Sequence, residues 1–122
     1  MTRAGATWEL STHVTFSVDM SNEEVSSEGV HIAGTFNMWD PTVTELLDYN
    51  GNGIYTVTVD LTNFVNETIE FKYINGNSWG NDEIVLDIIC GGAGDYGNRV
   101  LTVSEQDIVL DPVCFGYCVT KF

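Results

Sequence analysis

The sequence predicts an all-β protein, built as one antiparallel β-sandwich of about six to eight short strands. Three observations lead to this fold class. Nearly every patterned segment alternates apolar and polar residues with period two, which is the pattern of a half-buried strand. Asn-Gly and glycine-rich turns separate these segments. The chain has 122 residues, enough for one hydrophobic core but not for two.

The alternating segments set the expected strand order. They are residues 13–20, 29–36, 54–61, 68–74, 98–103 and 107–113, with a possible shorter strand at 43–47. In 68–74, one face carries Ile69, Phe71 and Tyr73, so Lys72 points to the opposite, outer face. This spacing of strands and turns predicts an immunoglobulin-like sandwich.

We expect a single domain over residues 1–122. Residues 1–11 form an N-terminal extension or strand, residues 12–103 form the core, and residues 104–122 form a cysteine-bearing C-terminal strand and tail.

The net charge of the chain limits the classes of partner that it can bind. Eighteen acidic residues face four basic ones, which gives a net charge of −14. Nucleic acids need Lys and Arg contacts to phosphate, so they are excluded as partners. Anionic membranes and acidic glycans are disfavoured for the same reason. No apolar run approaches the length of about 20 residues that crosses a bilayer. A neutral ligand is the class most compatible with this negative charge.

Three cysteines lie near the C-terminal end, at Cys90, Cys114 and Cys118. Without histidine-rich surroundings they do not form a zinc-binding pattern. We expect a disulfide between Cys90 and either Cys114 or Cys118, with one leftover thiol. This pairing favours an oxidising compartment, so a secreted or cell-surface protein. Three buried free cysteines in a cytosolic protein are the alternative.

The sequence contains no recognisable catalytic motif. Both histidines, His13 and His31, fall in predicted strands, and no nucleophile motif or phosphate-binding loop is present. We therefore expect no catalytic residues, no cofactor and no metal. A weak calcium alternative exists at Asp48, Asn50 and Asn52, but the bidentate Glu of a calcium loop is missing and a polar turn is favoured.

Two tryptophans stand where a core tryptophan would not. Trp39 and Trp79 lie in turns rather than in the apolar phase of a strand. An indole face can stack on the C–H face of a sugar ring, and Lys72 supplies donors for hydroxyl oxygens. These residue types together predict a small sugar-binding site.

The same turns belong to a longer motif. Its parts are Gly34-Thr35-Phe36-Asn37-x-Trp39, Gly53-x-Tyr55, Glu70-Phe71-Lys72-Tyr73-Ile74-Asn75-Gly76-x-x-Trp79-x-x-Asp82 and Asn98-Arg99-Val100-Leu101-Thr102-Val103. Over residues 12–103 the chain resembles the starch- and glycogen-binding module of the AMP-activated kinase β subunit and of α-glucan-active enzymes. The resemblance implies a non-catalytic module for α-glucan or a similar neutral polysaccharide. It also implies that Trp39 and Trp79 stack on glucose units, and that Lys72 and Asn98 hydrogen-bond the sugar.

Two features depart from that module. The loop that carries Trp79 is one residue longer, and the C-terminal tail carries Cys114 and Cys118. The tail resembles a version of the module found as repeats in secreted bacterial proteins.

An alternative hypothesis is that the protein is a structural subunit of an extracellular assembly or filament. Residues 6–20 would then be a strand exchanged between copies, anchored by Trp8 and Leu10.

Overall fold

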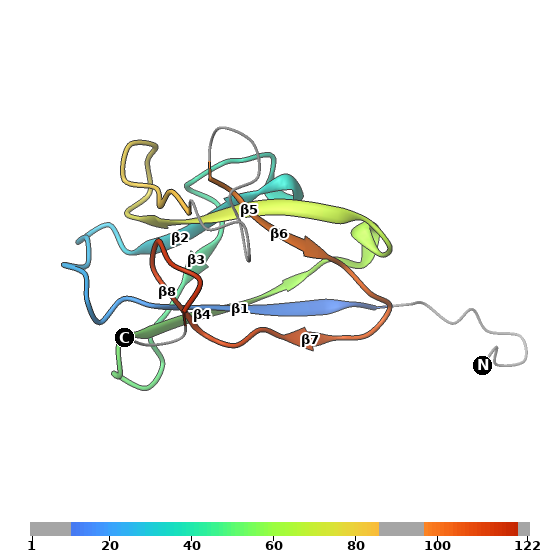
Figure 1. The fold of residues 1–122 in the computed structure, drawn as a ribbon, viewed down its shortest axis with the longest axis horizontal. Helices are drawn as coiled ribbons and strands as arrows, with labels where there is room; N and C mark the ends of the chain where they lie inside the picture. Colours follow the sequence, from blue (N-terminus) through green and yellow to red (C-terminus); the bar gives the residue numbers. More distant parts are fainter. Residues whose placement is uncertain (1–10, 86–96, 120–122) are drawn as a thin grey trace, which may run out of the picture.

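The computed structural model describes residues 11–85 and 97–119. The described chain forms two β-sheets that pack as a sandwich, which confirms the predicted all-β fold (Figure 1). Its strands are β1 (His13–Asp19), β2 (Val30–Gly34), β3 (Glu45–Leu46), β4 (Ile54–Asp60), β5 (Thr68–Asn75), β6 (Arg99–Thr102), β7 (Ile108–Val109) and β8 (Val113–Cys114). Two short 3₁₀ turns, η1 (Thr35–Asn37) and η2 (Thr62–Phe64), follow β2 and β4.

One sheet has the order β4-β1-β7, with β8 also paired to β1, and the other has the order β3-β2-β5-β6. The pairing of β1 with β4 is antiparallel, as are all pairings in the second sheet. The pairings of β1 with β7 and with β8 are short and parallel, so the sandwich is mainly antiparallel. The chain leaves β6 in one sheet and crosses to the other, where it runs alongside β1 in the same direction.

Each of the predicted strands contains observed strand, and most of the observed strands are shorter than predicted. The predicted strand 29–36 ends at Gly34 because η1 begins at Thr35. The predicted strand 107–113 is divided into β7 and β8. Pro112 lies in the interruption, and a proline has no N–H to donate to a ladder.

The core lies between the inward faces of the two sheets. The buried residues are Val14, Phe16, Val18, Met20, Val30, Ile32, Leu46, Leu61, Ile69, Phe71, Tyr73 and Val103. Phe16 is at its centre, with ring centroids 4.9 Å from Phe71 and 5.7 Å from Phe36. Burying each large side chain contributes about 1.5–3 kcal/mol. Because Ile69, Phe71 and Tyr73 fill this core, the other face of β5 is left to carry polar groups.

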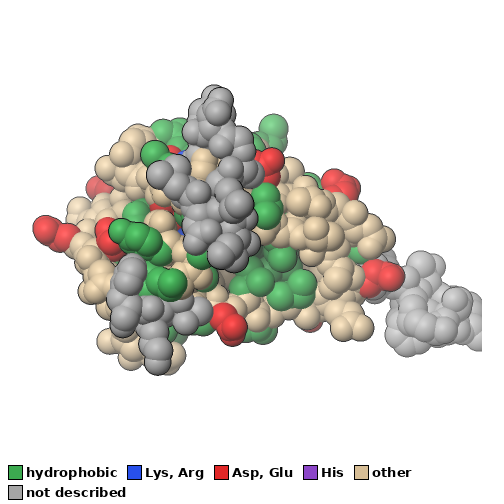
Figure 2. All heavy atoms as spheres, viewed as in Figure 1, with side chains coloured by type: hydrophobic (Ala, Val, Ile, Leu, Met, Phe, Trp, Pro, Cys, Tyr) green, Lys and Arg blue, Asp and Glu red, His purple; other side chains and the backbone are tan. Residues whose placement is uncertain are grey.

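The surface seen in Figure 2 carries acidic side chains around its periphery and almost no basic ones. This distribution agrees with the net charge of −14. Among the described residues no helix is long and apolar enough to cross a membrane.

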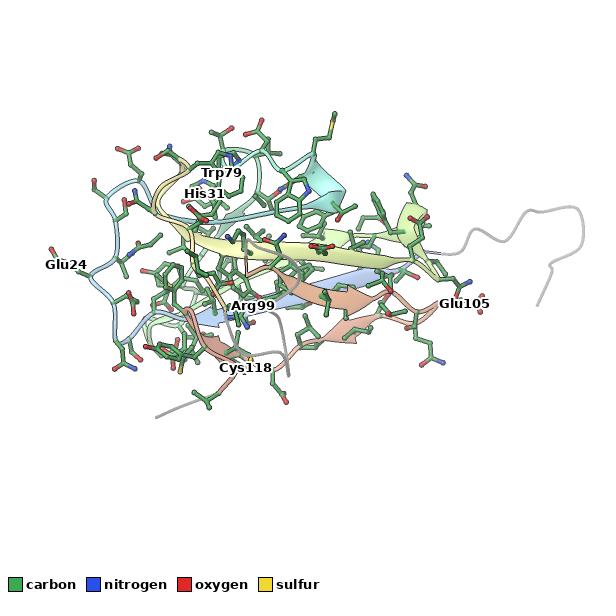
Figure 3. All side chains as sticks on the ribbon, turned by 45° about the horizontal axis from the view of Figure 1, so that its top comes forward. Glu24, His31, Trp79, Arg99, Glu105 and Cys118 are labelled. Carbon is green, nitrogen blue, oxygen red and sulfur yellow. The ribbon has the colours of Figure 1, made fainter. Side chains whose placement is uncertain are left out.

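A buried ion pair joins the segment after β5 to β6. The Arg99 side chain reaches into the molecule rather than onto its surface (Figure 3), and its Nε and Nη2 donate to the two carboxylate oxygens of Glu83 at 2.7 and 2.8 Å. The Glu83 side chain is fully buried, and the Arg99 side chain is 4% exposed. Glu83 also accepts hydrogen bonds from the backbone N–H groups of Tyr73 and Gly116. Arg99 in turn donates to the carbonyl of Tyr117, so this pair ties the C-terminal segment to the β5–β6 sheet.

The described cysteines correct one part of the disulfide prediction. Cys114 is a free thiol, buried at the end of β8, so the pairing of Cys90 with Cys114 is wrong. Burial raises the pKa of the Cys114 thiol, and the negative charge of Asp19 adds to this effect. No disulfide joins Cys114 to Cys118. Cys90 lies outside the described residues, and its pairing with Cys118 stays a prediction.

Candidate functional site

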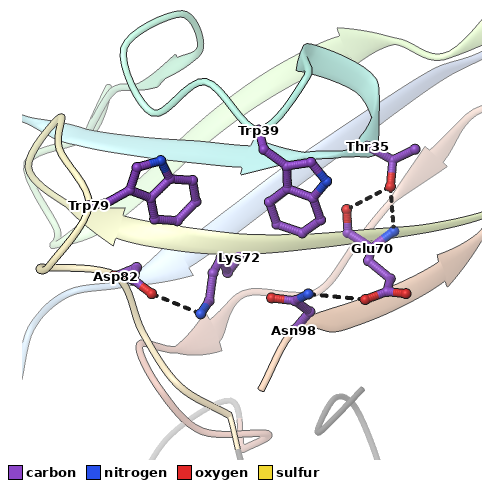
Figure 4. Close-up of a pocket in the computed structure, with 7 residues that line it drawn as sticks. All are labelled: Thr35, Trp39, Glu70, Lys72, Trp79, Asp82 and Asn98. Atoms are coloured by element: carbon purple, nitrogen blue, oxygen red, sulfur yellow. Dashed lines mark hydrogen bonds and ion pairs between the residues drawn. The ribbon is translucent and has the colours of Figure 1, made fainter. Parts of the chain in front are cut away.

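Trp39 and Trp79 lie next to each other on the outer face of the β3-β2-β5-β6 sheet (Figure 4). Their ring centroids are 6.4 Å apart and their planes are tilted by 38°. They form one side of a hollow of about 540 Å³, whose lining residues are Thr35, Trp39, Glu70, Lys72, Trp79, Asp82 and Asn98. The structure therefore brings all the predicted sugar-binding residues together in one place.

The turn that presents Trp39 is organised by the side chain of Asn37. The Asn37 Oδ1 accepts the N–H of Gly34 at 3.0 Å. The Asn37 Nδ2 donates to the carbonyl of Ile32 at 2.9 Å and to the Thr44 hydroxyl at 3.1 Å. A backbone hydrogen bond from the Trp39 N–H to the Gly34 carbonyl, 3.0 Å long, closes the turn. Asn37 is therefore a structural residue of this motif, and Trp39, which the turn presents, is half-buried.

The rest of the turn depends on the backbone at Gly34, Met38 and Trp39. A Cβ on Gly34 would lie 2.5 Å from the Glu70 carbonyl oxygen, so only glycine lets β2 approach β5 so closely here. Met38 and Trp39 both have φ of 60°, a left-handed conformation that side chains other than glycine adopt at a cost. The Asn37 hydrogen bonds hold this conformation in place.

Trp79 is carried by a hairpin that folds back along β5. Gly76 and Gly80 adopt φ of 127° and 111°, which allow the reversal. The returning segment then donates from the Glu83 N–H to the Tyr73 carbonyl at 3.0 Å. The lengthened loop still brings the Trp79 indole beside Trp39, with Trp79 47% exposed.

Lys72 lies on the outer face of β5, as predicted, but it is not solvent-exposed there. Its side chain is 5% exposed, and its ammonium donates to the Asp82 carboxylate at 2.8 Å. Burial opposes ionisation of Asp82, but hydrogen bonds from Lys72 and from the Gly80 N–H outweigh it and hold the pKa of Asp82 below its usual range. The ammonium of Lys72 is thus fixed in position at the floor of the hollow.

This ion pair should make stability depend on pH in acid. The folded state binds the Asp82 proton more weakly than the unfolded state, whose pKa is about 3.9. The ionised Asp82 therefore stabilises the fold above about pH 4, and this contribution is lost as pH falls through the lowered folded pKa. We expect Asp82→Asn to lower the thermal midpoint at pH 7 and to match the wild type in strong acid. Parallel midpoint-against-pH curves for the two proteins would contradict this role.

Asn98 directly precedes β6, and it is 7% exposed. Its Nδ2 donates to the Glu70 carboxylate at 3.0 Å. Its Oδ1 is buried and has no hydrogen-bond partner in the part of the chain that the structure describes. A buried acceptor without a partner is uncommon in proteins, and Asn98 is one of the residues that line the hollow.

Thr35, Glu70 and Asp82 line the hollow, although the sequence analysis did not assign them to the site. The alternation of side chains along a strand could have identified Glu70 as a site residue. It lies two residues before Lys72 and so shares its face of β5. Asp82 occurs in the quoted motif but was not given a role. Its contact with Lys72 depends on the path of the hairpin, which the sequence does not reveal.

The remaining candidate residues lie away from the hollow. His31 is buried, and its Nδ1 contacts the Gly76 carbonyl at 2.7 Å, the structural role expected for a strand histidine. His13 lies within 4.0 Å of the carboxylates of Asp60 and Asp107.

The residues of the weak calcium alternative lie in a turn where side-chain oxygens accept hydrogen bonds from the turn's own backbone. The Asp48 carboxylate accepts the N–H groups of Asn52 and Gly53, and these bonds hold the pKa of Asp48 below its usual range, with Gly53 the main cause. The Asn52 side chain accepts the N–H of Ile54. Among the described residues no group of three or more His, Cys, Asp or Glu side chains is placed to hold a metal ion. Asp48, Asn50 and Asn52 are therefore best interpreted as parts of a polar turn.

A scan against protein-family models gives no match for this chain, and a search of curated protein sequences gives none either. The resemblance to starch- and glycogen-binding modules therefore rests on the motif residues and their arrangement.

Proposed function

We propose that this chain is a non-catalytic, extracellular carbohydrate-binding module for α-glucan or a similar neutral polysaccharide. One observation carries the proposal: two tryptophans, a lysine and an asparagine from separate segments of the chain line a single hollow. A volume of about 540 Å³ is within the range of small-ligand sites, about 300–1,000 Å³.

The geometry of the two indoles supports a curved glycan. Stacking places a sugar ring parallel to an indole plane, so two platforms tilted by 38° accommodate sugar rings that are not coplanar. A chain that coils, as α-glucan does, offers such rings, whereas a flat ribbon-like chain offers coplanar ones. The half-exposed Trp79 would cover one ring and Trp39 its neighbour.

The charges support a neutral ligand. The carboxylates of Glu70 and Asp82 border the hollow, and the whole chain carries a net charge of −14. A uronic or sulfated sugar would bring further negative charge into this field. A hydroxyl group can instead interact with the Lys72 ammonium or with the Asn98 carboxamide.

We expect saturable binding of maltoheptaose, a soluble α-glucan oligomer, when it is titrated into the protein in a calorimeter. Cellohexaose tests the preference for a curved chain, and an oligogalacturonate tests the preference for a neutral one. Both should bind more weakly. Absence of any saturable heat with maltoheptaose, or equal binding of the oligogalacturonate, would contradict the proposal.

The extracellular location depends on the disulfide that remains possible, between Cys90 and Cys118. Mass mapping of the protein without reduction should find these two cysteines linked and Cys114 free. The linkage would close a loop of about 28 residues and stabilise the fold by about 3 kcal/mol in the chain-entropy account. Finding three free thiols would remove both the linkage and the extracellular proposal.

One observation favours the alternative, a structural subunit of an extracellular assembly. Among the described residues, β6 and β7 each lie at one edge of their sheet, and each exposes a valine: Val100 is 45% and Val109 is 77% exposed. An exposed apolar edge strand can pair with a strand from another copy. The strand suggested for such exchange carries Trp8 and Leu10, which lie outside the described residues. Sedimentation as a monomer at low and high salt would remove this alternative.

A further inference from the structure

The chain contains three Asn-Gly dipeptides, at Asn50-Gly51, Asn52-Gly53 and Asn75-Gly76. In such a dipeptide the backbone nitrogen of the glycine can attack the side-chain carbonyl carbon of the asparagine, because glycine has no Cβ to hinder the approach. The attack requires an asparagine side chain that is free to turn, a glycine N–H group that is not held elsewhere, and a backbone that can move. The three dipeptides differ in how far the structure meets these conditions.

The first dipeptide, Asn50-Gly51, is the least restrained. Both residues are exposed in the turn between β3 and β4, and the Asn50 side chain makes no hydrogen bond to another described residue. Gly51 adopts φ of 68°, and a Cβ at this position would meet no atom within 4 Å, so the backbone has open space around it. The pKa of Asp48 is lowered mainly by the Gly53 N–H group and to a smaller extent by the Gly51 N–H group.

The second dipeptide, Asn52-Gly53, lies in the same turn but is held at both reacting groups. The Asn52 Oδ1 accepts the N–H of Ile54 at 3.1 Å, which fixes the side chain that would be attacked. The Gly53 N–H, which contains the attacking nitrogen, donates to the Asp48 carboxylate at 2.9 Å. The Gly53 carbonyl also accepts the N–H of Met20 at 2.8 Å. Reaction at Asn52 therefore requires that at least two hydrogen bonds break first.

The third dipeptide begins at Asn75, the last residue of β5, whose side chain is half-buried. The Asn75 Oδ1 accepts the N–H of Ser26 at 2.8 Å, and its Nδ2 donates to the carbonyl of Glu24 at 3.0 Å. The Asn75 backbone N–H donates to the carbonyl of Asn81 at 3.0 Å. Both ends of this carboxamide are thus occupied, and the backbone that carries it is fixed.

We propose that Asn50 is a site of spontaneous deamidation, and that the fold protects the other two Asn-Gly dipeptides. The Gly51 nitrogen forms a bond to the Asn50 Cγ and loses its proton. The bond from Cγ to Nδ2 breaks, and the NH₂ group leaves with that proton as ammonia. Water then opens the cyclic succinimide at one of its two carbonyl carbons. The products carry aspartate or isoaspartate at position 50, and each adds one negative charge to a chain whose net charge is −14.

This inference is independent of the proposed function. Asn50 is not among the residues that line the hollow, and its reaction needs water and no glycan. A failure to bind maltoheptaose therefore leaves the inference intact, and an unreactive Asn50 leaves the proposed function intact.

The first test compares deamidation of the full chain in mildly alkaline buffer with and without guanidinium chloride. Mass spectrometry of the digested protein measures the exchange of NH₂ for OH, and fragmentation distinguishes Asn50 from Asn52. Each hydrogen bond that must break lowers the reactive population by about threefold to tenfold, so Asn50 should react at least about tenfold faster than Asn52 or Asn75 in the folded protein. In denaturant the three should react at similar rates. Similar rates in the folded protein, or a faster reaction at Asn52 or Asn75, would overturn the proposal.

The products test the chemical route. Opening of a succinimide gives isoaspartate together with aspartate, whereas direct hydrolysis of the carboxamide by water gives aspartate alone. Enzymatic methylation with S-adenosylmethionine labels isoaspartate, and we expect labelled peptide at position 50. Aspartate alone would overturn the attack by Gly51.

The variants Asp48→Ala and Asn50→Gln test the protection of Asn52 and the identity of the site. Asp48→Ala removes the acceptor of the Gly53 N–H, so Asn52 should react about threefold to tenfold faster than in the wild type. Asn50→Gln keeps a carboxamide but requires a larger ring, so the acidic form seen by ion exchange should appear far more slowly. Urea unfolding shows that each variant is folded. An unchanged rate at Asn52 in folded Asp48→Ala would overturn the protection, and an unslowed acidic form in Asn50→Gln would overturn the site.

Discussion

Replacing Arg99 with methionine is expected to destabilise the protein by about 3–5 kcal/mol. The change leaves the Glu83 carboxylate, which is fully buried, without the guanidinium that neutralises it. It also removes the donor to the Tyr117 carbonyl. A loss of this size is a large fraction of the stability of a small domain, which is about 5–15 kcal/mol. Urea denaturation followed by circular dichroism measures it.

The Arg99→Met/Glu83→Gln double variant is the matched control for this prediction. A neutral glutamine removes the uncompensated charge. Its carbonyl oxygen can still accept one of the two N–H groups, from Tyr73 and from Gly116, that Glu83 accepts through its two separate carboxylate oxygens. The double variant should therefore be more stable than Arg99→Met alone. A double variant that is equally or less stable would show that the loss comes from packing rather than from an unpaired charge.

Replacing either Trp39 or Trp79 with alanine is expected to weaken maltoheptaose binding by about thirtyfold, or about 2 kcal/mol, as is usual for a tryptophan at the centre of a binding site. The stability of the fold should change little. The Trp79 side chain is half-exposed, and neither indole belongs to the buried core cluster. Calorimetric titration measures the affinity, and urea denaturation measures the stability of the same samples.

Tyr49→Ala provides the comparison for the tryptophan variants. Tyr49 is an aromatic residue that is 74% exposed and does not line the hollow. It should therefore leave the affinity unchanged. Binding that survives both tryptophan substitutions would contradict the assignment of the indoles as stacking platforms. A loss of folding in either variant would contradict their placement outside the core.

The fold could be predicted where one strand face is apolar over several residues. In β1, Val14, Phe16 and Val18 alternate with polar residues, and all three are buried. The partner and the direction of pairing could not be predicted for β7 and β8, whose contacts with β1 are two-residue parallel pairings. Such short segments carry too little periodicity to define a partner or a direction.

The site could be predicted only as a set of residue types. The sequence placed Trp39 and Trp79 in turns and Lys72 on the outer face, because strand phase is local information. It did not predict that Lys72 would be buried against Asp82, or that Arg99 would pair with Glu83. Both contacts depend on how the hairpin after β5 folds back, which is a long-range property of the chain. That the Asn98 Oδ1 is buried without a hydrogen-bond partner among the described residues likewise depends on long-range packing.

The most direct test of a glycan site at Trp39 and Trp79 is the NMR signal of the indole N–H groups during titration with maltoheptaose. The chain has three tryptophans, so each indole signal can be assigned by substitution. The Trp39 and Trp79 signals should move together and saturate with one dissociation constant, equal to that from calorimetry. Saturable binding that leaves the Trp39 and Trp79 signals unmoved would contradict the assignment of this hollow as the glycan site.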